Sequence, residues 1–526
     1  MKTFYKIILM FNVHYSIFNV PCFSQTAPGI EWAKCYGGSD DDGAYSIDQT
    51  TDGGYVVTGR SNSTNGDITI HYGSTDYWVA KIDSAGTIQW QKSLGGTDTD
   101  IGNSIQQTTD GGFVAAGISF SNDSNVTGNH GGADYWVVKL DSAGSIQWQK
   151  SLGGTGWDGA TSVLQADDGS YVVAGLSTSN DGDVTGNHGG YDYWVVKLDS
   201  SGNLLWQKCF GGTADDGAEF IKQTNDGGYM VVGESNSNDG DVTGNHGNFD
   251  YWVVKIDSAG TIQWQKSSGG TNLDYAYSFC QSADGSYMVF GNTFSNDSDV
   301  TGNHGGSDYW VIKLDSSGSF QWQKCFGGTG NERAQSIVQT TDGRYVLAGF
   351  SNSNNGDVTI SYGNGDFWIV KIDSSGTIHW QKSLGGTNTD WAYSIQHTTD
   401  GAYVIAGNSY SIDNDVSGNH GNGDYWVVKL RPEEGTGIPN FQYSITNLQI
   451  SPNPAKEFTV INYQFIKGDE IRIIDVLGET IFAKIFSSPT LNFKLQTLNY
   501  PAGVYLFNLA NEKTRERVNG KIVVSN

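Results

Sequence analysis

The chain has 526 residues with 71 glycines, 8 prolines and a formal net charge of −26. This length allows two or more domains with well-buried cores, and abundant Gly, Tyr, Trp and Val favours short strands joined by tight turns over helices. The negative charge argues against nucleic acid or an anionic lipid surface as a partner, and it is compatible with divalent cations or simply with solubility.

Residues 1–24 resemble a secretory signal peptide. Lys2 and Lys6 precede the apolar run Ile7-Ile8-Leu9-Met10-Phe11, and we expect cleavage near Ser24. No run of about 18 apolar residues occurs anywhere in the chain, so the sequence predicts no transmembrane helix.

Tryptophans recur with a period of 58 residues. One set is Trp78, Trp136, Trp194, Trp252, Trp310, Trp368 and Trp426, and a second is Trp32, Trp90, Trp148, Trp206, Trp264, Trp322 and Trp380. Such a period indicates a repeat architecture of seven equal units between residues 30 and 430.

Each unit divides into four apolar segments separated by turn signals. An Asp-Gly pair, such as Asp168-Gly169, follows the first segment, and an Asp-Ser-Ser-Gly run, such as 199–202, follows the third. The chain begins with a lone fourth segment (30–34) and ends with a lone third segment (424–430), and pairing the two would close a ring. The sequence therefore predicts an all-β fold, a seven-bladed β-propeller with four-stranded blades.

The run Val-Val-Lys-Leu-Asp-Ser-Ser-Gly-Asn-Leu-Leu-Trp at 195–206 resembles the hairpin of quinoprotein-type propellers, in which a tryptophan after the turn docks one blade against the next. This resemblance covers only the hairpin, and it supports the fold rather than any chemistry.

The composition changes after Leu430. A polar linker is expected at 431–444, followed at 445–526 by the alternating strands of a small β-sandwich. The motifs Pro452-Asn453-Pro454, Asp475-Val476-Leu477-Gly478, Gly503-Val504-Tyr505 and Lys521-Ile522-Val523-Val524 resemble the type A C-terminal sorting domain of the Bacteroidetes type IX secretion system. The resemblance implies recognition by that machinery, export across the outer membrane, removal of the domain, and attachment to the cell surface or release.

A carboxylate stands ten residues after each tryptophan of the second set: Asp42, Asp100, Asp158, Asp216, Asp274, Glu332 and Asp390. We expect all seven in the connections that enter the innermost strands, around one mouth of the central channel. Clustered oxygens would suit calcium. Alternatively, each carboxylate satisfies backbone N–H groups of its own turn.

The long loop between the second and third segments carries a histidine or tyrosine at one position: His130, His188, His246, His304, His420, Tyr72 and Tyr362. Exchange of His for Tyr argues against metal ligation and favours an exposed ring that binds or stacks. Alternatively, the loop is an Asx-rich segment fixed by its own side-chain hydrogen bonds. Two further tryptophans, Trp157 and Trp391, interrupt the repeat. We expect them in loops on the same face, as candidate binding residues that contact a ligand through their rings.

Two functions remain open. The repeated loops favour multivalent recognition of a glycan or a surface protein. The alternative is an enzyme acting on extracellular polysaccharide at the channel mouth, near Glu332, Arg333 and Trp391. No catalytic motif is present in the sequence, so binding is the preferred interpretation, and a purely structural surface protein is a third possibility.

Overall fold

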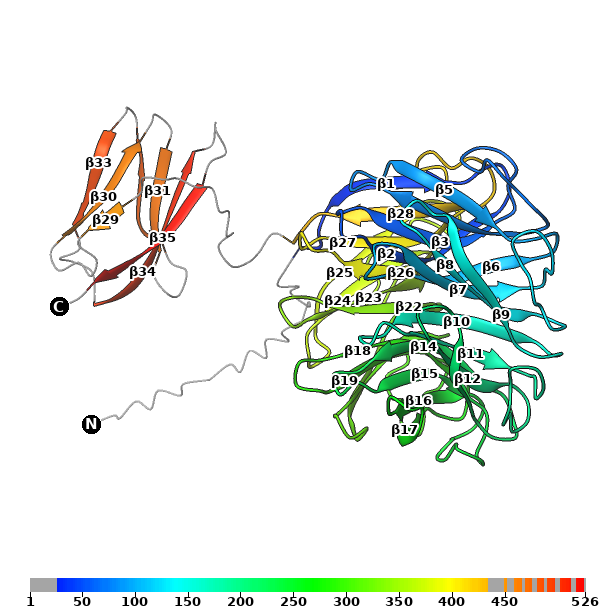
Figure 1. Ribbon diagram of the computed structural model, residues 1–526. Coiled ribbons are helices and arrows are strands. Elements are labelled where there is room, and N and C mark those ends of the chain that lie inside the picture. The colour runs from blue at the N-terminus through cyan, green and yellow to red at the C-terminus, as the bar shows by residue number, and fades with distance from the viewer. Residues whose placement is uncertain are drawn as a thin grey trace, which may run out of the picture. The chain divides into compact units, whose positions relative to one another are not determined.

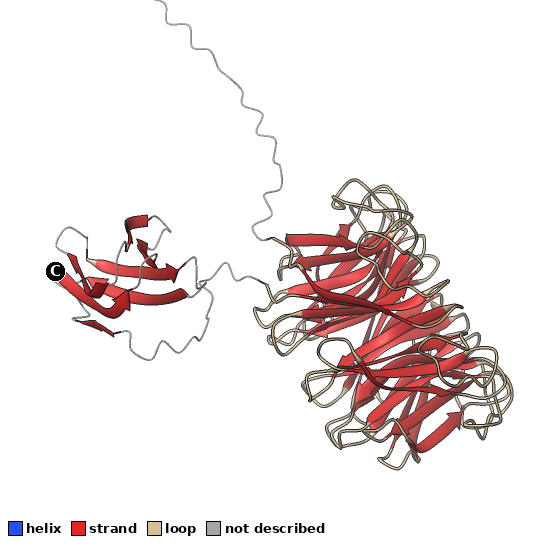
Figure 2. Cartoon of the chain, turned by 90° about the horizontal axis from the view of Figure 1, so that it is seen from above, coloured by secondary structure: helices blue, strands red, loops and turns tan. Residues whose placement is uncertain are grey.

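The computed structural model describes residues 26–433, 449–451, 458–465, 469–474, 480–486, 490–496, 502–511 and 517–524. They form two units, divided between Glu433 and Glu434. The described elements are all strands (Figure 2), which confirms the all-β prediction, and none of them is a helix long and apolar enough to cross a membrane. The predicted signal peptide and residues 434–444 of the predicted linker lie outside the described residues.

The first unit consists of seven antiparallel sheets of four strands each, named here from the axis outward. The innermost strands are β2 (Asp42–Gln49), β6 (Asp100–Gln107), β10 (Asp158–Gln165), β14 (Asp216–Gln223), β18 (Asp274–Gln281), β22 (Glu332–Gln339) and β26 (Asp390–His397). The second strands are β3 (Tyr55–Ser61), β7 (Phe113–Ser119), β11 (Tyr171–Ser177), β15 (Tyr229–Ser235), β19 (Tyr287–Thr293), β23 (Tyr345–Ser351) and β27 (Tyr403–Ser409).

The third strands are β4 (Asp76–Ile82), β8 (Asp134–Leu140), β12 (Asp192–Leu198), β16 (Asp250–Ile256), β20 (Asp308–Leu314), β24 (Asp366–Ile372) and β28 (Asp424–Leu430). The outermost strands are β5 (Ile88–Leu94), β9 (Ile146–Leu152), β13 (Leu204–Phe210), β17 (Ile262–Ser268), β21 (Phe320–Phe326), β25 (Ile378–Leu384) and β1 (Ile30–Tyr36).

These sheets are the blades of a seven-bladed propeller, as predicted (Figure 1). Six blades keep chain order, as in β2-β3-β4-β5, whereas the seventh has the order β26-β27-β28-β1. In that blade the first strand of the chain pairs antiparallel with β28, from Ile30 opposite Leu430 to Tyr36 opposite Tyr425. The predicted ring closure is therefore confirmed.

The core lies between the blades. The third-strand tryptophans are completely buried and pack against the neighbouring blade, as Trp252 does against Tyr193 at a ring distance of 4.6 Å. The Tyr193 hydroxyl also donates to the Trp252 carbonyl at 2.9 Å. The outermost tryptophans dock differently, because Trp32 donates its indole N–H to the Ser84 carbonyl in a turn of the next blade.

The second unit comprises two sheets, β29-β30-β33 and β32-β31-β34-β35. Their strands are β29 (Gln449–Ser451), β30 (Phe458–Phe465), β31 (Asp469–Ile474), β32 (Thr480–Ile485), β33 (Thr490–Gln496), β34 (Gly503–Asn511) and β35 (Arg517–Val524). A contact between the rings of Phe482 and Phe493, 5.8 Å apart, joins the two sheets. The predicted motifs at 452–454 and 475–478 lie outside the described residues.

Candidate functional site

The seven units differ from one another mainly near one end of the two innermost strands. The second residue of the innermost strand is Gly43, Ile101, Gly159, Gly217, Tyr275, Arg333 or Trp391. Its fourth residue is Tyr45, Asn103, Thr161, Glu219, Tyr277, Gln335 or Tyr393. The residue opposite the first set, as Arg60 is opposite Gly43, is Arg60, Ile118, Leu176, Glu234, Asn292, Phe350 or Asn408. Here the sevenfold repeat gives way to an asymmetric surface.

A β-bulge directs the fourth residue toward the axis. In every blade the pairing of the two innermost strands shifts at this residue, for example between Ala160 and Ser162. A bulge leaves one residue outside the ladder and re-aims its side chain. The seven bulged residues accordingly line a cavity of 340 Å³, together with the serines or phenylalanine that follow them.

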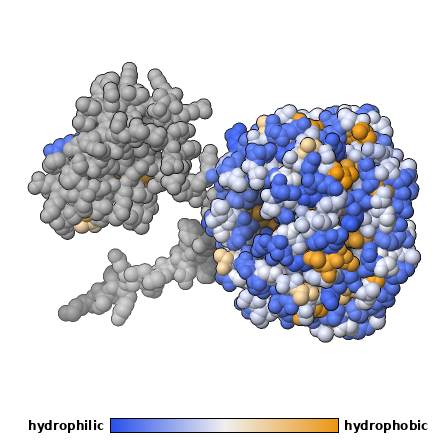
Figure 3. Space-filling view, in the orientation of Figure 1, coloured by the Kyte–Doolittle hydropathy of each residue, from blue (hydrophilic) through white to orange (hydrophobic). Residues whose placement is uncertain are grey.

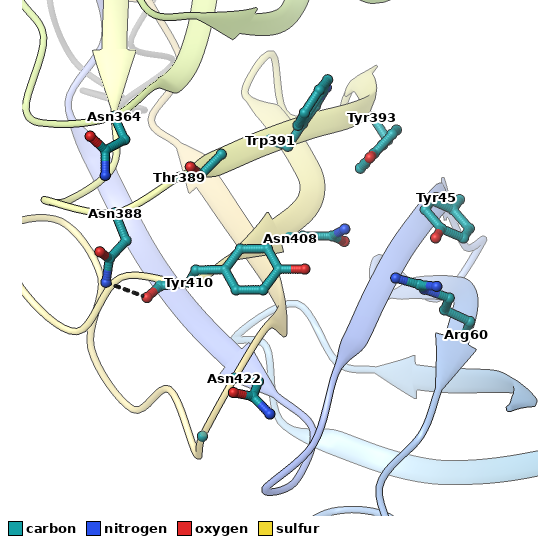
Figure 4. Close-up of a pocket in the computed structure, with 11 residues that line it drawn as sticks. Tyr45, Arg60, Asn364, Asn388, Thr389, Trp391, Tyr393, Asn408, Tyr410 and Asn422 are labelled. Atoms are coloured by element: carbon teal, nitrogen blue, oxygen red, sulfur yellow. Dashed lines mark hydrogen bonds between the residues drawn. The ribbon is translucent and has the colours of Figure 1, made fainter. Parts of the chain in front are cut away.

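A larger cavity of 710 Å³ opens at the seventh blade (Figure 4). We call it the blade-7 pocket, and its lining residues are Tyr45, Arg60, Asn364, Asn388, Thr389, Trp391, Tyr393, Asn408, Tyr410, Gly421 and Asn422. Tyr45 and Tyr393 line both cavities, so the pocket adjoins the axial cavity.

Aromatic rings form one wall of the blade-7 pocket. Trp391 stacks on Phe350 with a ring distance of 4.6 Å and an angle of 24°, and it lies nearly parallel to Tyr393 at 6.1 Å and 10°. Tyr45 meets Tyr393 edge to face at 5.0 Å. These contacts hold the rings in fixed orientations.

Polar groups complete the lining. Arg60 forms an ion pair with Asp41 at 2.7 Å, and the Tyr410 hydroxyl donates to the other oxygen of Asp41 at 2.7 Å. Three buried polar atoms of lining residues have no hydrogen-bond partner among the described residues: Arg60 Nε, Asn408 Oδ1 and Trp391 Nε1. Buried polar atoms are nearly always satisfied, so this group of two donors and one acceptor indicates a place for ligand groups.

Two carboxyl groups of the fourth blade stand near the axis. Glu219 lines the axial cavity, and burial raises its pKa to about 7. Burial and the neighbouring Glu219 also raise the pKa of Glu234 well above its usual value, and its Oε2 has no hydrogen-bond partner among the described residues. Both groups therefore hold their protons to a higher pH than an exposed glutamic acid does.

The seven carboxylates predicted as calcium ligands begin the innermost strands and are buried. Asp42 accepts hydrogen bonds from the Gly38 N–H at 2.7 Å, from Ser63 Oγ at 2.8 Å and from Ser61 Oγ. A glycine N–H and a hydroxyl bond each of the other six in the same way. This geometry matches the alternative interpretation, in which each carboxylate satisfies its own turn.

A second carboxylate approaches each of these groups from the preceding blade. A Cβ placed on Gly211 would lie 2.6 Å from Asp216 Oδ2 and 2.9 Å from Asp192 Oδ1. The Oδ1 atoms of Asp76, Asp134, Asp192, Asp250, Asp308, Asp366 and Asp424 are buried without partners. Across the described ranges no three His, Cys, Asp or Glu side chains form a metal-binding group. Calcium binding stays a prediction.

The predicted loop histidines contact the first aspartate of the following strand. His188 Nδ1 lies 2.6 Å from Asp192 Oδ2, and the other four make the same contact. Tyr72 and Tyr362 keep only the bond from their backbone N–H, at 2.8 Å. The histidine side chains are 30–43% exposed, so their outer edges remain accessible to a ligand.

The two non-repeating tryptophans occupy different positions. Trp157 precedes β10 in a loop, as expected, and its ring lies against Gly159. Trp391 is the second residue of β26 and not part of a loop, and it lines the blade-7 pocket. Sequence reasoning missed Tyr45, Arg60, Asn408 and Tyr410. The sequence signal that could have found them is that the residue type at these four positions varies between the units.

Comparison with known proteins defines the second unit. Residues 449–525 match the family model of the secretion system C-terminal sorting domain, which confirms the predicted type IX sorting domain. The chain is therefore an exported β-propeller with a C-terminal sorting domain, and the sorting domain implies secretion or display at the cell surface.

Two curated proteins match parts of this chain at low sequence identity. The regulatory protein FlaEY of Caulobacter vibrioides is 23% identical over 377 residues, which are 63% of this chain and 39% of that protein. The endo-acting ulvan lyase of Formosa agariphila is 29% identical over 101 residues, 19% of each protein. The chain thus spans less than half the length of these curated relatives.

Two solved structures are similar at 11% identity. PorZ, a surface component of the type IX secretion system of Porphyromonas gingivalis, has a TM-score of 0.42, with 93% of this chain and 60% of that chain covered. A puromycin hydrolase has a TM-score of 0.44, with 84% and 62% covered. The assignment of the propeller rests on its strand topology.

Proposed function

We propose that this is an exported carbohydrate-binding protein whose propeller holds a glycan in the blade-7 pocket. The observation that carries this proposal is the group of three unpartnered polar atoms beside parallel aromatic rings. Aromatic faces pack against the C–H faces of sugars, and a few placed donors and acceptors then orient the hydroxyls. The face of the propeller seen in Figure 3 is largely hydrophilic, as suits a protein that binds solvated ligands.

Asymmetry supports one principal site. The other blades carry residues of a different kind at the positions of Trp391, Arg60 and Asn408, apart from the aromatic Tyr275 at the position of Trp391 and Asn292 at that of Asn408. A ligand that depended on seven equal sites would gain nothing from these departures.

The test is glycan-array binding of the full-length chain. Trp391→Ala should weaken binding about tenfold, equivalent to about 1.4 kcal/mol. Trp157→Ala is the matched control, because Trp157 is another half-buried tryptophan outside the pocket. Unchanged binding by Trp391→Ala would place the site elsewhere, and running the array with calcium and with chelator tests the predicted calcium dependence.

The accessible edges of the loop histidines favour a second candidate, multivalent binding by equivalent loops to a glycan or surface protein. Linked weak sites add avidity without new contacts. If this holds, replacing His188, His246 and His304 by Asn one after another should reduce binding in steps, and Trp391→Ala should have no effect.

The raised pKa of Glu219, which lines the axial cavity, favours the enzymatic alternative. A carboxyl group with a pKa of about 7 is suited to general acid–base work on a polysaccharide. Release of new reducing ends that is lost in Glu219→Gln would support this alternative, and intact polysaccharide after prolonged incubation would exclude it for the substrates used.

We also propose that the propeller acts at the cell surface or in the medium after loss of its signal peptide and sorting domain. Mass spectrometry of the exported protein would then show both termini shortened. An exported chain that keeps residues 449–525 would contradict this processing.

A further inference from the structure

Arginines are rare in the propeller; one of them, Arg60, lines the blade-7 pocket, and another, Arg333, lies against its Trp391. Residues 26–433 contain four arginines and fifteen lysines. Fourteen of those lysines recur at two positions per unit, in the third and outermost strands, whereas Arg60 lies in β3 and Arg333 in β22. At the positions that differ between units near one end of the two innermost strands, the positively charged side chains are therefore all arginines.

Arg60 lines the pocket with unused donors. Its NH2 group bonds Asp41, while its Nε is buried without a partner. The Asp41 carboxylate is shared with the Tyr410 hydroxyl. Because a guanidinium offers five N–H donors, the ion pair with Asp41 leaves donors available to a ligand. Figure 4 shows Arg60 facing Tyr410 and Asn408 across the pocket.

Arg333 stands on the other side of Trp391. Its guanidinium carbon lies 5.3 Å from the centre of a Trp391 ring, and its side chain is exposed. Within the described ranges it forms no ion pair. A guanidinium stacked on an aromatic ring is held in place while its N–H edge stays free.

The nearby carboxyl groups offset these charges only in part. Burial raises the pKa values of Glu219, to about 7, and of Glu234, so their negative charge near neutral pH is reduced. Asp41 balances part of the positive charge of Arg60 and does not pair with Arg333. Charges farther away on this acidic protein are screened beyond about 8 Å at physiological ionic strength.

We propose, on the basis of the proposed carbohydrate binding, that the glycan carries an anionic substituent, a carboxylate or a sulfate ester, that the guanidinium groups of Arg60 and Arg333 recognise. Both substituents present the oxygens that a guanidinium fork binds with paired, charge-assisted hydrogen bonds. The aromatic wall then holds the sugar ring, and the arginines select its charge.

The test compares three polysaccharides binding to the full-length protein: polygalacturonate for carboxylate, carrageenan for sulfate, and a neutral β-glucan. We expect an acidic polymer to bind, the neutral one to bind at least tenfold more weakly, and rising salt to weaken the acidic complex. Arg333→Gln should reduce acidic binding about tenfold. Arg333 is exposed, so this variant should fold.

Arg344→Gln is the matched control. Arg344 lies at the other end of the same hairpin, in the turn after β22, and pairs with Asp342 at 2.7 Å. Its loss should leave binding unchanged. Neutral glucan bound as tightly as the acidic polymers, or no change in Arg333→Gln, would overturn the anionic specificity and leave carbohydrate binding standing. No binding of any of the three by the wild-type chain would overturn both.

Discussion

The Trp380 indole donates a hydrogen bond to the Glu433 carboxylate at 3.1 Å. Two other outermost tryptophans, Trp32 and Trp90, donate instead to a turn carbonyl in the next blade, as Trp90 does to Ser142 at 3.2 Å. The seventh blade has no such turn, because its outermost strand is the start of the chain. Glu433 takes the place of the turn, and it also accepts hydrogen bonds from Tyr403 at 2.6 Å and Lys371 at 2.7 Å.

Glu433→Ala should lower the free energy of unfolding of the propeller by about 2 kcal/mol, because three buried or half-buried donors lose a charged acceptor. Denaturant titration measures the change. Glu31→Ala is the control, since Glu31 lies 3.4 Å from Lys429 with its side chain 40% exposed and should contribute little. Equal effects of the two variants would contradict the role of Glu433.

Loss of one hydrogen bond between two blades should lower the free energy of unfolding measurably. Tyr193→Phe deletes the hydrogen bond to the Trp252 carbonyl and should cost about 1 kcal/mol. The repeat supplies its own control, because among the described residues the Tyr77 hydroxyl makes no bond to the equivalent Trp136 carbonyl, and Tyr77→Phe should cost less than Tyr193→Phe. Thermal melts of the two variants decide the matter, and a larger loss for Tyr77→Phe would refute the assignment.

Stability should rise from pH 8 to pH 5. Burial raises the pKa of Asp192, Asp250 and Asp308 to about 6. A folded-state pKa above the unfolded value of about 3.9 favours the protonated native state, so this stabilisation is full below about pH 4 and is lost as the pH rises through 6. Melting temperatures at pH 5 and pH 8 check the sign.

At lower pH the trend should reverse. The hydrogen bond from Lys197 lowers the pKa of Asp168 to about 2, and that stabilisation disappears as the pH falls from about 4 to 2. The melting temperature should therefore peak between about pH 4 and 6. Asp192→Asn mimics the protonated form and should reduce the decline toward pH 8, and an unchanged decline would show that other groups cause it.

The described cysteines should be unreactive in the native state. Cys35, Cys209, Cys280 and Cys325 are free thiols, and burial raises the pKa of Cys35 and Cys209 to about 12 and that of Cys280 to about 11. Thiolate is the reactive form. These four thiols should react with a disulfide reagent at pH 8 only after denaturation. Rapid reaction of several thiols per chain in the native protein would contradict this prediction.

The propeller fold could be predicted from the sequence because the same packing contacts recur in every unit. A tryptophan every 58 residues and two complementary chain ends were enough to predict seven blades and their closure. The predicted ring of carboxylates was harder to place. Ser61 and Ser63 fold over Asp42 from the second strand, and only the paired strands reveal that contact.

The blade-7 pocket was predictable only in part. Trp391 stood out as an extra tryptophan, but Arg60 and Asn408 come from different blades and meet through ring closure. The bulge that turns Tyr45 and Tyr393 toward the axis depends on strand register. Residue spacing alone did not predict that register.

Ring closure by β1 also governs when binding becomes possible. The pocket draws on the first and last repeats, which are more than 300 residues apart in the chain and meet only when β1 pairs with β28. A partly synthesised or truncated propeller therefore presents no complete pocket, and ligand binding reports that the whole circle has been assembled.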